Sequence, residues 1–210
     1  KYHRIRVMNN KIKKILKKKN KSKIVCLTAY SKNIAEIIDD HADIVLVGDS
    51  LGSVLYNYDT TRKVSLEMMI EHTKSARMGI KKSLLVIDLP YNTYRNKSEA
   101  LKNSKKAIKQ SNCDAIKVEG GTKVKEIVKH LIKNRIPVLG HIGVTPQTTK
   151  GKFRSKGKNE SEIRKLLKDA KDLEQSGAFG IVLECIYSDI SKQITNSINI
   201  PTIGIGASVN

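Results

Sequence analysis

Short runs of aliphatic residues recur along the chain, and segments with helical spacing of apolar residues separate them. Runs this aliphatic are typical of strands buried on both faces, and their alternation with helices predicts a parallel sheet with helical crossovers. The expected strands lie at residues 24–30, 43–52, 84–90, 115–121, 137–143, 180–185 and 201–207. The expected helices lie at residues 8–19, 34–38, 65–79, 98–110, 122–132, 161–176 and 189–197. We expect a loop at residues 56–59, a polar loop at residues 145–159, and helix ends marked by Gly79, at the C′ position, and by Gly177.

The pattern contains seven strands, whereas a closed (β/α)8 barrel needs eight. The seventh run ends three residues before the end of the given sequence. We therefore expect either an open sheet or a barrel whose eighth strand and C-terminal helices lie beyond residue 210, and we favour the barrel. A sheet that stopped at the seventh strand would leave unpaired edges, and such edges invite aggregation.

Length and charge limit the class of protein. The chain has 210 residues, enough for one sizeable core, so we expect a single domain over residues 1–210 with a basic helix within residues 1–22. Lys and Arg outnumber Asp and Glu by 40 to 20, a net charge of +20 that raises a nucleic-acid hypothesis. The lysines are spread over nearly every expected helix, and the aromatic residues, only 4% of the chain, are not interleaved with them as a stacking platform requires. We interpret the charge as solvated helix faces and expect no nucleic-acid partner.

Cysteine content and hydropathy indicate the compartment. Cys26, Cys113 and Cys185 are an odd number without close metal-type spacing, so we expect free thiols in a reducing compartment. No apolar stretch approaches the roughly 18 residues of a membrane span, and the basic N-terminus lacks the apolar core of a signal peptide. We therefore expect a cytoplasmic protein without a membrane partner.

Carboxylates fall at the carboxyl ends of four expected strands, at Asp49, Asp88, Glu119 and Glu184. Barrel enzymes carry their active sites on this face. Four carboxylates that converge would repel one another without a cation, and oxygen-only ligands suit a hard divalent ion such as Mg²⁺. The alternative for Asp49, Asp88 or Glu119 is a helix N-cap or a loop charge, and Asp49, between a glycine and a serine, fits a turn equally well.

Three other polar residues extend this group. Lys117 precedes Glu119 by two positions on one strand, so both side chains point the same way. The lysine either binds a substrate carboxylate, which we expect, or pairs with a neighbouring acid. Ser50 is placed to donate to the same anion, although a lone serine in a turn is uninformative. His141 ends the fifth strand, where it either faces the cavity or is hydrogen-bonded within the core.

Six short motifs occur in a fixed order: VGDSLG (47–52), DLP (88–90), KVEGG (117–121), GHIGVTPQ (140–147), LEC (183–185) and PTIGIGA (201–207). Together they closely resemble the ketopantoate hydroxymethyltransferase (3-methyl-2-oxobutanoate hydroxymethyltransferase) family, and the resemblance runs from about residue 23 to the end. It implies a (β/α)8 TIM barrel of the phosphoenolpyruvate/pyruvate-like superfamily and a homodecamer or other homo-oligomer.

The resemblance also implies a reaction. A hydroxymethyl group passes from 5,10-methylenetetrahydrofolate to 3-methyl-2-oxobutanoate through a Mg²⁺-stabilised enolate, giving 2-dehydropantoate and tetrahydrofolate in pantothenate biosynthesis. The family's metal ligands fall on Asp49, Asp88 and Glu119, the last directly or through water. Its 2-oxo-acid contacts fall on Asp49, Ser50, Asp88 and Lys117, and its proton acceptor falls on Glu184. His141 is expected as a nearby hydrogen-bonding group.

The chain departs from the family's pattern at Ser31, where Asp is usual, at Asn57, where Gly is common, and at Ser208, which replaces a Gly. Asn57 is compatible if its backbone is left-handed, a region that Asn visits. The main alternative is another Mg²⁺-dependent 2-oxo-acid lyase or mutase of the same superfamily. Those enzymes often carry a catalytic cysteine in the loop after the fifth strand, and residues 145–159 contain none. A basic nucleic-acid-binding protein is a remote alternative, because it leaves the carboxylates unexplained.

Overall fold

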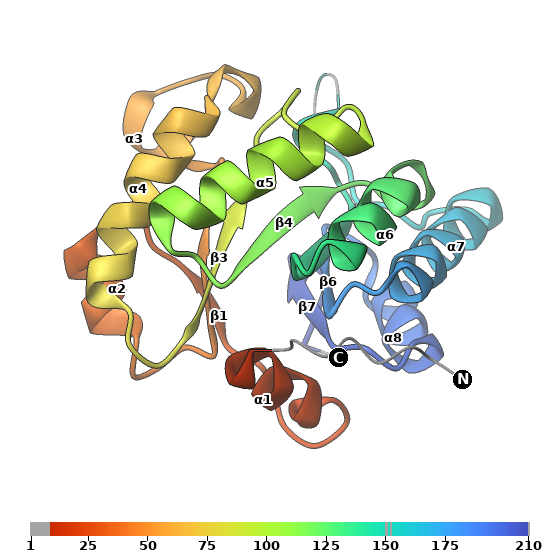
Figure 1. The fold of residues 1–210 in the computed structure, drawn as a ribbon. Helices are drawn as coiled ribbons and strands as arrows, with labels where there is room; N and C mark the ends of the chain where they lie inside the picture. Colours follow the sequence, from red (N-terminus) through yellow and green to blue (C-terminus); the bar gives the residue numbers. More distant parts are fainter. Residues whose placement is uncertain (1–8, 150, 152, 210) are drawn as a thin grey trace.

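A computed structural model describes residues 9–149, 151 and 153–209 of the chain. Parallel strands pair in sequence order to form one curved, nearly closed sheet, with helices around its outer face (Figure 1). The strands are β1 (Cys26–Thr28), β2 (Ile44–Val47), β3 (Leu84–Asp88), β4 (Ala115–Glu119), β5 (Val138–Gly143), β6 (Gly180–Glu184) and β7 (Thr202–Ile205). Among the described residues, the hydrogen-bonded ladders run from β1 to β7 and none joins β7 back to β1. The seven expected strands are therefore confirmed, and their arrangement is that of a barrel.

The helices follow the strands in alternation, as the sequence predicts. They are α1 (Asn10–Lys18), α2 (Lys32–Ile38), α3 (Leu51–Tyr56), α4 (Leu66–Gly79), α5 (Lys97–Ser111), α6 (Lys125–Lys133), α7 (Glu160–Ser176) and α8 (Ser188–Ser197), with short 3-10 helices η1 (Thr61–Lys63) and η2 (Thr122–Val124). Several begin at a side chain that satisfies a free backbone N–H group. Ser65, Asn96 and Asn159 each accept a hydrogen bond from the third residue of the helix that follows.

Alternating side chains on the strands build two separate apolar layers. In β3, Leu85 and Ile87 pack outward in the larger cluster beneath the helices, whereas Leu84 and Val86 belong to a smaller cluster inside the barrel. Because every residue of β3 is buried, this strand is covered on both faces. The same alternation decides which polar residues near the strand ends point into the barrel.

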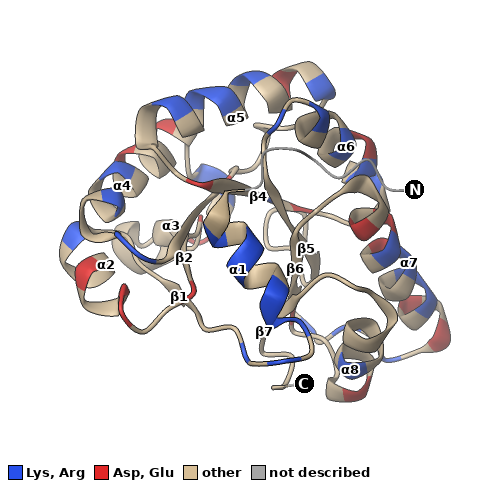
Figure 2. Ribbon diagram, turned by 60° about the horizontal axis from the view of Figure 1, so that its bottom comes forward, with Lys and Arg blue, Asp and Glu red and all other residues tan. Residues whose placement is uncertain are grey.

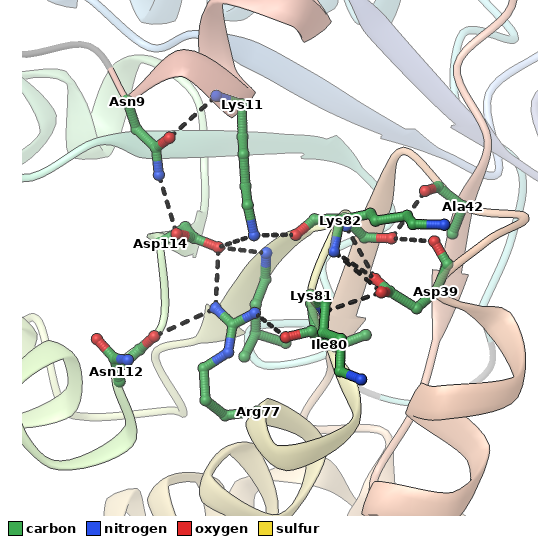
Figure 3. Close-up of polar contacts among 12 residues, drawn as sticks. Asn9, Lys11, Asp39, Ala42, Arg77, Ile80, Lys81, Lys82, Asn112 and Asp114 are labelled. Carbon is green, nitrogen blue, oxygen red and sulfur yellow. Dashed lines mark hydrogen bonds and ion pairs between the residues drawn. The ribbon is translucent and has the colours of Figure 1, made fainter.

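Helix α1 closes the end of the barrel at which the strands begin. Ile12 and Ile15 are buried in the interior cluster, and Figure 2 shows α1 lying across this end. Asn9 donates to Asp114 Oδ1 at 2.9 Å, just before β4, and Lys11 Nζ donates to the backbone oxygen of Ser83 at 2.7 Å, just before β3 (Figure 3). The predicted basic helix is thus present over Asn10–Lys18, while residues 1–8 lie outside the described part of the chain.

Two carboxylates, Asp39 and Asp114, also fix the turns at this end. Asp114 accepts from Arg77 Nη1 at 3.1 Å and from the backbone N–H of Leu85 at 2.9 Å. Asp39 accepts from the backbone N–H groups of Lys81, Lys82 and Ser83 (Figure 3). Although burial opposes ionisation, these hydrogen bonds lower the pKa of Asp39. Both acids are therefore structural.

Two local expectations need correction. A loop is expected around Tyr56, but α3 extends to that residue and ends at Asn57, whose φ of 53° is left-handed as the sequence requires. Gly79 is expected just beyond the end of its helix, but it lies within α4. A Cβ on Gly79 would lie 2.4 Å from the backbone oxygen of Lys32, so the glycine allows close contact with α2. Gly177 does end α7 in a left-handed conformation, as expected.

Two other sequence predictions concern thiols and membranes. Cys26, Cys113 and Cys185 are all free, and Cys113 is buried. Of the helices in the described ranges, none is both long enough and apolar enough to cross a bilayer.

Candidate active site

The predicted carboxylates meet at the carboxyl end of the barrel. Asp88, Glu119 and Glu184 are the last residues of β3, β4 and β6, and Asp49 lies two positions beyond β2. Asp88 follows the inward-facing Val86 by two residues, so its side chain enters the same interior. Asp49 and Asp88 are only 4% and 2% exposed, and the backbone N–H of Asp49 donates to Asp88 Oδ2 at 3.2 Å. The predicted convergence of these acids is therefore observed.

Lys117 lies buried beside this pair of acids. Its Nζ donates to Asp88 Oδ1 at 2.8 Å. Burial disfavours the ammonium, but Asp88, Glu119 and Asp49 outweigh burial and raise the pKa of Lys117. The ion pair with a neighbouring acid is thus formed in this structure. Because an ammonium carries three N–H donors, the same group also retains donors for a substrate carboxylate.

His141 stands between two of the carboxylates. Its Nδ1 lies 3.5 Å from Glu119 Oε1, and its Nε2 lies 3.3 Å from Glu184 Oε2. Burial and the Lys117 charge act against the imidazolium, but Glu119 and Glu184 prevail and raise the pKa of His141. Of the two positions that the sequence allows, His141 occupies the one that faces the polar interior.

Ser50 lies near the entrance to the cluster, at the start of α3. Its Oγ is 2.8 Å from the hydroxyl of Tyr30, which follows β1. Burial, together with the charges of Asp88 and Asp49, raises the pKa of Tyr30. The phenol is therefore neutral at ordinary pH and can either donate to Ser50 or accept from it.

Sequence reasoning did not single out two residues that complete the site, Gln147 and Tyr94. Gln147 lies in the loop after β5, and its side-chain Nε2 donates to Asp49 Oδ2 at 2.8 Å. Its backbone N–H donates to Glu119 Oε2 at 3.1 Å. The hydroxyl of Tyr94, between β3 and α5, donates to Gln147 Oε1 at 2.5 Å. The only signal in the sequence is that Gln147 ends the GHIGVTPQ motif.

A cavity of about 520 Å³ adjoins the cluster on the side of β4 and β5. Glu119, Gln147 and Tyr94 form part of its wall, together with the backbone of Gly120 and Gly121. Its volume is within the range that is typical of small-molecule sites. The polar interior of the barrel thus opens onto a space large enough for a ligand.

The charges of the cluster fit a divalent cation. Burial and the neighbouring Asp88 raise the pKa of Asp49 to about 7, and burial raises the pKa of Asp88 as well. Lys117, together with His141 when it is protonated, faces four carboxylates, those of Asp49, Asp88, Glu119 and Glu184. A hard cation with oxygen ligands would balance the remainder. In the described part of the chain, no three Asp, Glu, His or Cys side chains already lie in metal-binding geometry.

Parallel strands in a barrel, with a lysine and carboxylates inside its carboxyl end, define an enzyme of the (β/α)8 class. Comparison with known proteins identifies the particular family. The sequence model described as ketopantoate hydroxymethyltransferase matches residues 9–210, so the chain belongs to that family and is a transferase.

Curated relatives carry the same name. The chain is 62% identical over 203 residues to 3-methyl-2-oxobutanoate hydroxymethyltransferase of Pelagibacter ubique (strain HTCC1062), covering 97% of this chain and 79% of that protein. It is 46% identical over 205 residues to the enzyme of that name from Clostridium botulinum (strain Langeland / NCTC 10281 / Type F), covering 95% and 74%. The resemblance noted from the six motifs is therefore confirmed.

Solved structures show the fold at much lower identity. A phosphonopyruvate hydrolase matches with a TM-score of 0.70 at 10% identity, over 93% of this chain and 71% of that one. A 2,3-dimethylmalate lyase, described as a member of the PEP mutase/isocitrate lyase superfamily, matches with a TM-score of 0.65 at 13% identity, over 94% and 72%. The predicted barrel fold is therefore confirmed.

Proposed function

We propose that the chain transfers a hydroxymethyl group from 5,10-methylenetetrahydrofolate to 3-methyl-2-oxobutanoate. The acceptor loses its C3 proton and gains CH2OH, whose oxygen comes from water, so that the products are 2-dehydropantoate and tetrahydrofolate. The name of the family supports the reaction. The observation that supports a mechanism is the chain of contacts that joins Asp49, Asp88 and Lys117 inside the carboxyl end of the barrel.

In this proposal Asp49 and Asp88 hold a Mg²⁺ ion, with Glu119 as a ligand directly or through water. Their oxygen-only chemistry and their shortage of positive charge support this assignment. When bound, the cation acts as a Lewis acid that draws electron density from the keto group of the substrate. The solved structure of a phosphonopyruvate hydrolase with oxalate and Mg²⁺ is an example of such a ligand pair in a protein with a similar fold.

The side chains around the acids are proposed to bind the 2-oxo acid. Lys117 Nζ, held at 2.8 Å by Asp88, directs its other N–H donors to the substrate carboxylate. Ser50 Oγ, positioned by Tyr30, donates to the same anion. Asp49 and Asp88, beside Lys117, are proposed to contact the 2-oxo acid as well. Because Lys117 and the acids are buried, these contacts exclude water from the reacting carbon.

Glu184 is proposed to remove the C3 proton, which is acidic because it lies next to the keto group. Its carboxylate is partly exposed, unlike Asp88, and lies across the barrel on β6. His141, 3.3 Å away, restricts the direction in which that carboxylate points. Because Glu184 is not one of the proposed cation ligands, the cation does not neutralise its carboxylate, which remains available to accept the proton.

The organisation of the protein is proposed as follows. The given chain forms one barrel domain, works in the cytoplasm as a homodecamer or other homo-oligomer, and has no nucleic-acid or membrane partner. Lys and Arg side chains are scattered around the outer helices instead of forming one stripe (Figure 2), which supports solvated faces over a nucleic-acid site.

Deuterium exchange tests the proposal. We expect the protein to replace the C3 proton of 3-methyl-2-oxobutanoate in D₂O, followed by NMR, when Mg²⁺ is present and not when EDTA is added. Glu184→Gln is expected to abolish the exchange, whereas the control Glu160→Gln, at a side chain that is 86% exposed, leaves it unchanged. If no 2-dehydropantoate forms even with the folate present, the proposed reaction is wrong and a lyase or mutase reaction on a 2-oxo acid remains as the alternative.

A further inference from the structure

Gln147 links two carboxylates, one just beyond β2 and the other at the end of β4. It is 1% exposed and stands between Asp49 and Glu119. Its side-chain amide donates to Asp49 Oδ2 at 2.8 Å and to the backbone oxygen of Leu89 at 3.0 Å. Its backbone N–H donates to Glu119 Oε2 at 3.1 Å. One residue of the loop after β5 therefore determines the direction of both acids.

The orientation of the Gln147 amide is fixed by its partners. Both acceptors near Nε2 are oxygens, and Oε1 receives the hydroxyl hydrogen of Tyr94 at 2.5 Å. A rotated amide would place its own oxygen against Asp49 Oδ2, which carries no hydrogen when ionised. The Tyr94 hydroxyl also accepts a hydrogen bond from the backbone N–H of Glu119 at 3.3 Å, so Tyr94 contacts both Gln147 and Glu119.

The link is also anchored from a third segment. Arg62 Nε, within η1, donates to the backbone oxygen of Gln147 at 2.8 Å, and the guanidinium lies 5.0 Å from the ring centre of Tyr91. The loop after β5 is therefore held by the segments that follow α3 and β3. Every hydrogen-bonding group of Gln147 thereby has a partner within the described residues.

A neutral donor suits this position better than a charged one. An ammonium would neutralise Asp49, as Lys117 does at Asp88, whereas an amide fixes one carboxylate oxygen and leaves the charge available. Within the described part of the chain, Oδ1 of Asp49 accepts no hydrogen bond, so this oxygen is free to contact a ligand. Groups that orient metal ligands in this way affect binding strongly without touching the metal.

We propose that Gln147 is the positioning residue that holds the carboxylates of Asp49 and Glu119 in the orientation that binds a divalent cation and the 2-oxo acid, with Tyr94 fixing its amide. The inference rests on the proposed function, since it assigns a role within the same site. Gln147 and Tyr94 are not catalytic residues in this scheme, because they act through the carboxylates.

The first test is the affinity of the full chain for Mn²⁺, measured by electron paramagnetic resonance without substrate. Gln147→Met keeps a similar volume but removes all three side-chain hydrogen bonds, those with Asp49, Leu89 and Tyr94, and we expect Mn²⁺ to bind about 10- to 100-fold more weakly. Gln193→Met, on the exposed surface of α8, is the matched control and should bind as the original chain does. Circular dichroism and a thermal melt check that each variant is folded. Wild-type Mn²⁺ affinity in folded Gln147→Met overturns the proposal.

The second test separates positioning from simple packing. Tyr94→Phe keeps the ring but removes the hydroxyl, and we expect about tenfold weaker Mn²⁺ binding. If the two residues act as one unit, the double variant binds no more weakly than Gln147→Met alone. Losses that multiply in the double variant contradict the link. If Gln147→Met does not fold, Tyr94→Phe decides, and unchanged affinity then overturns the proposal.

Deuterium exchange distinguishes this inference from the proposed function. At saturating Mg²⁺, Gln147→Met is expected to exchange the C3 proton more slowly and with a higher KM for 3-methyl-2-oxobutanoate, because Asp49 loses its side-chain donor while Glu119 keeps its backbone donor. A wild-type protein that forms no 2-dehydropantoate even with the folate present contradicts the proposed function. A wild-type protein that exchanges, beside a Gln147→Met variant with the same rate, KM and Mn²⁺ affinity, contradicts only the role of Gln147.

Discussion

Cation binding should depend steeply on pH, because a proton competes for Asp49. Burial and Asp88 raise the pKa of Asp49 to about 7 in the cation-free protein. At pH 8 this carboxyl is about nine-tenths ionised, and at pH 5 about 1% ionised. A cation that requires the ionised form must displace the proton, so its dissociation constant should rise about tenfold per pH unit below 7.

Between pH 8 and pH 5 the loss should therefore be about a hundredfold, or about 3 kcal/mol of binding free energy. Asp88, whose pKa is also raised, makes the dependence steeper. Calorimetric titration with Mg²⁺ at half-unit pH steps measures it. Asp49→Asn serves as the comparison, because its weaker binding should lose the part of the slope that Asp49 contributes. An affinity that stays constant from pH 8 to pH 5 refutes this reasoning.

The same carboxyl affects the stability of the cation-free protein in the opposite sense. Its pKa is about 7 in the folded chain and 3.8 in the unfolded chain, so between these values the folded chain holds a proton that the unfolded chain releases. Its contribution to the free energy of unfolding therefore falls as pH rises from about 4 to about 7. Urea unfolding in EDTA, compared between the original chain and Asp49→Asn, measures this contribution. A contribution that rises over that window contradicts the assignment.

Two further predictions concern the scaffold, both measured by urea unfolding. Ile12→Ala should lower the free energy of unfolding by about 2–5 kcal/mol because Ile12 is fully buried. The control Ile37→Ala, at a residue that is 67% exposed, should change it by less than about 0.5 kcal/mol. Equal effects of the two substitutions would contradict the role of α1. Gly121→Ala should destabilise the chain because its Cβ would lie 2.1 Å from Asp169, whereas Gly151→Ala meets nothing within 4 Å and adds only the strain of its positive φ; a neutral Gly121→Ala would mean that α7 can move away.

The sequence predicts the placement of site residues that lie on strands, because side chains alternate there with a period of two. Asp88, Glu119 and Lys117 lie on buried strands, where side chains alternate strictly between the two faces of the sheet. The position of each residue along its strand therefore determines which face its side chain points to. The ion pair of Lys117 could not be decided in this way, since both alternatives place the lysine inside the barrel. Only the distance to Asp88 distinguishes them.

Residues on irregular segments were beyond such reasoning. Gln147 lies in a polar loop, where no period fixes the direction of a side chain. Its position depends on Arg62 and Tyr94, which come from segments far away in the sequence. Helix α3 was also missed, because a six-residue helix that follows turn-forming residues shows too little periodicity to detect.

Helix α1 limits the directions from which a ligand can reach the site. Ile12 and Ile15 fill the end of the barrel where the strands begin, and Asn9 and Lys11 fasten the helix there. The acids around Asp88 are therefore covered on the side where the strands begin. A ligand that binds them cannot enter across α1 and must approach from another side of the barrel.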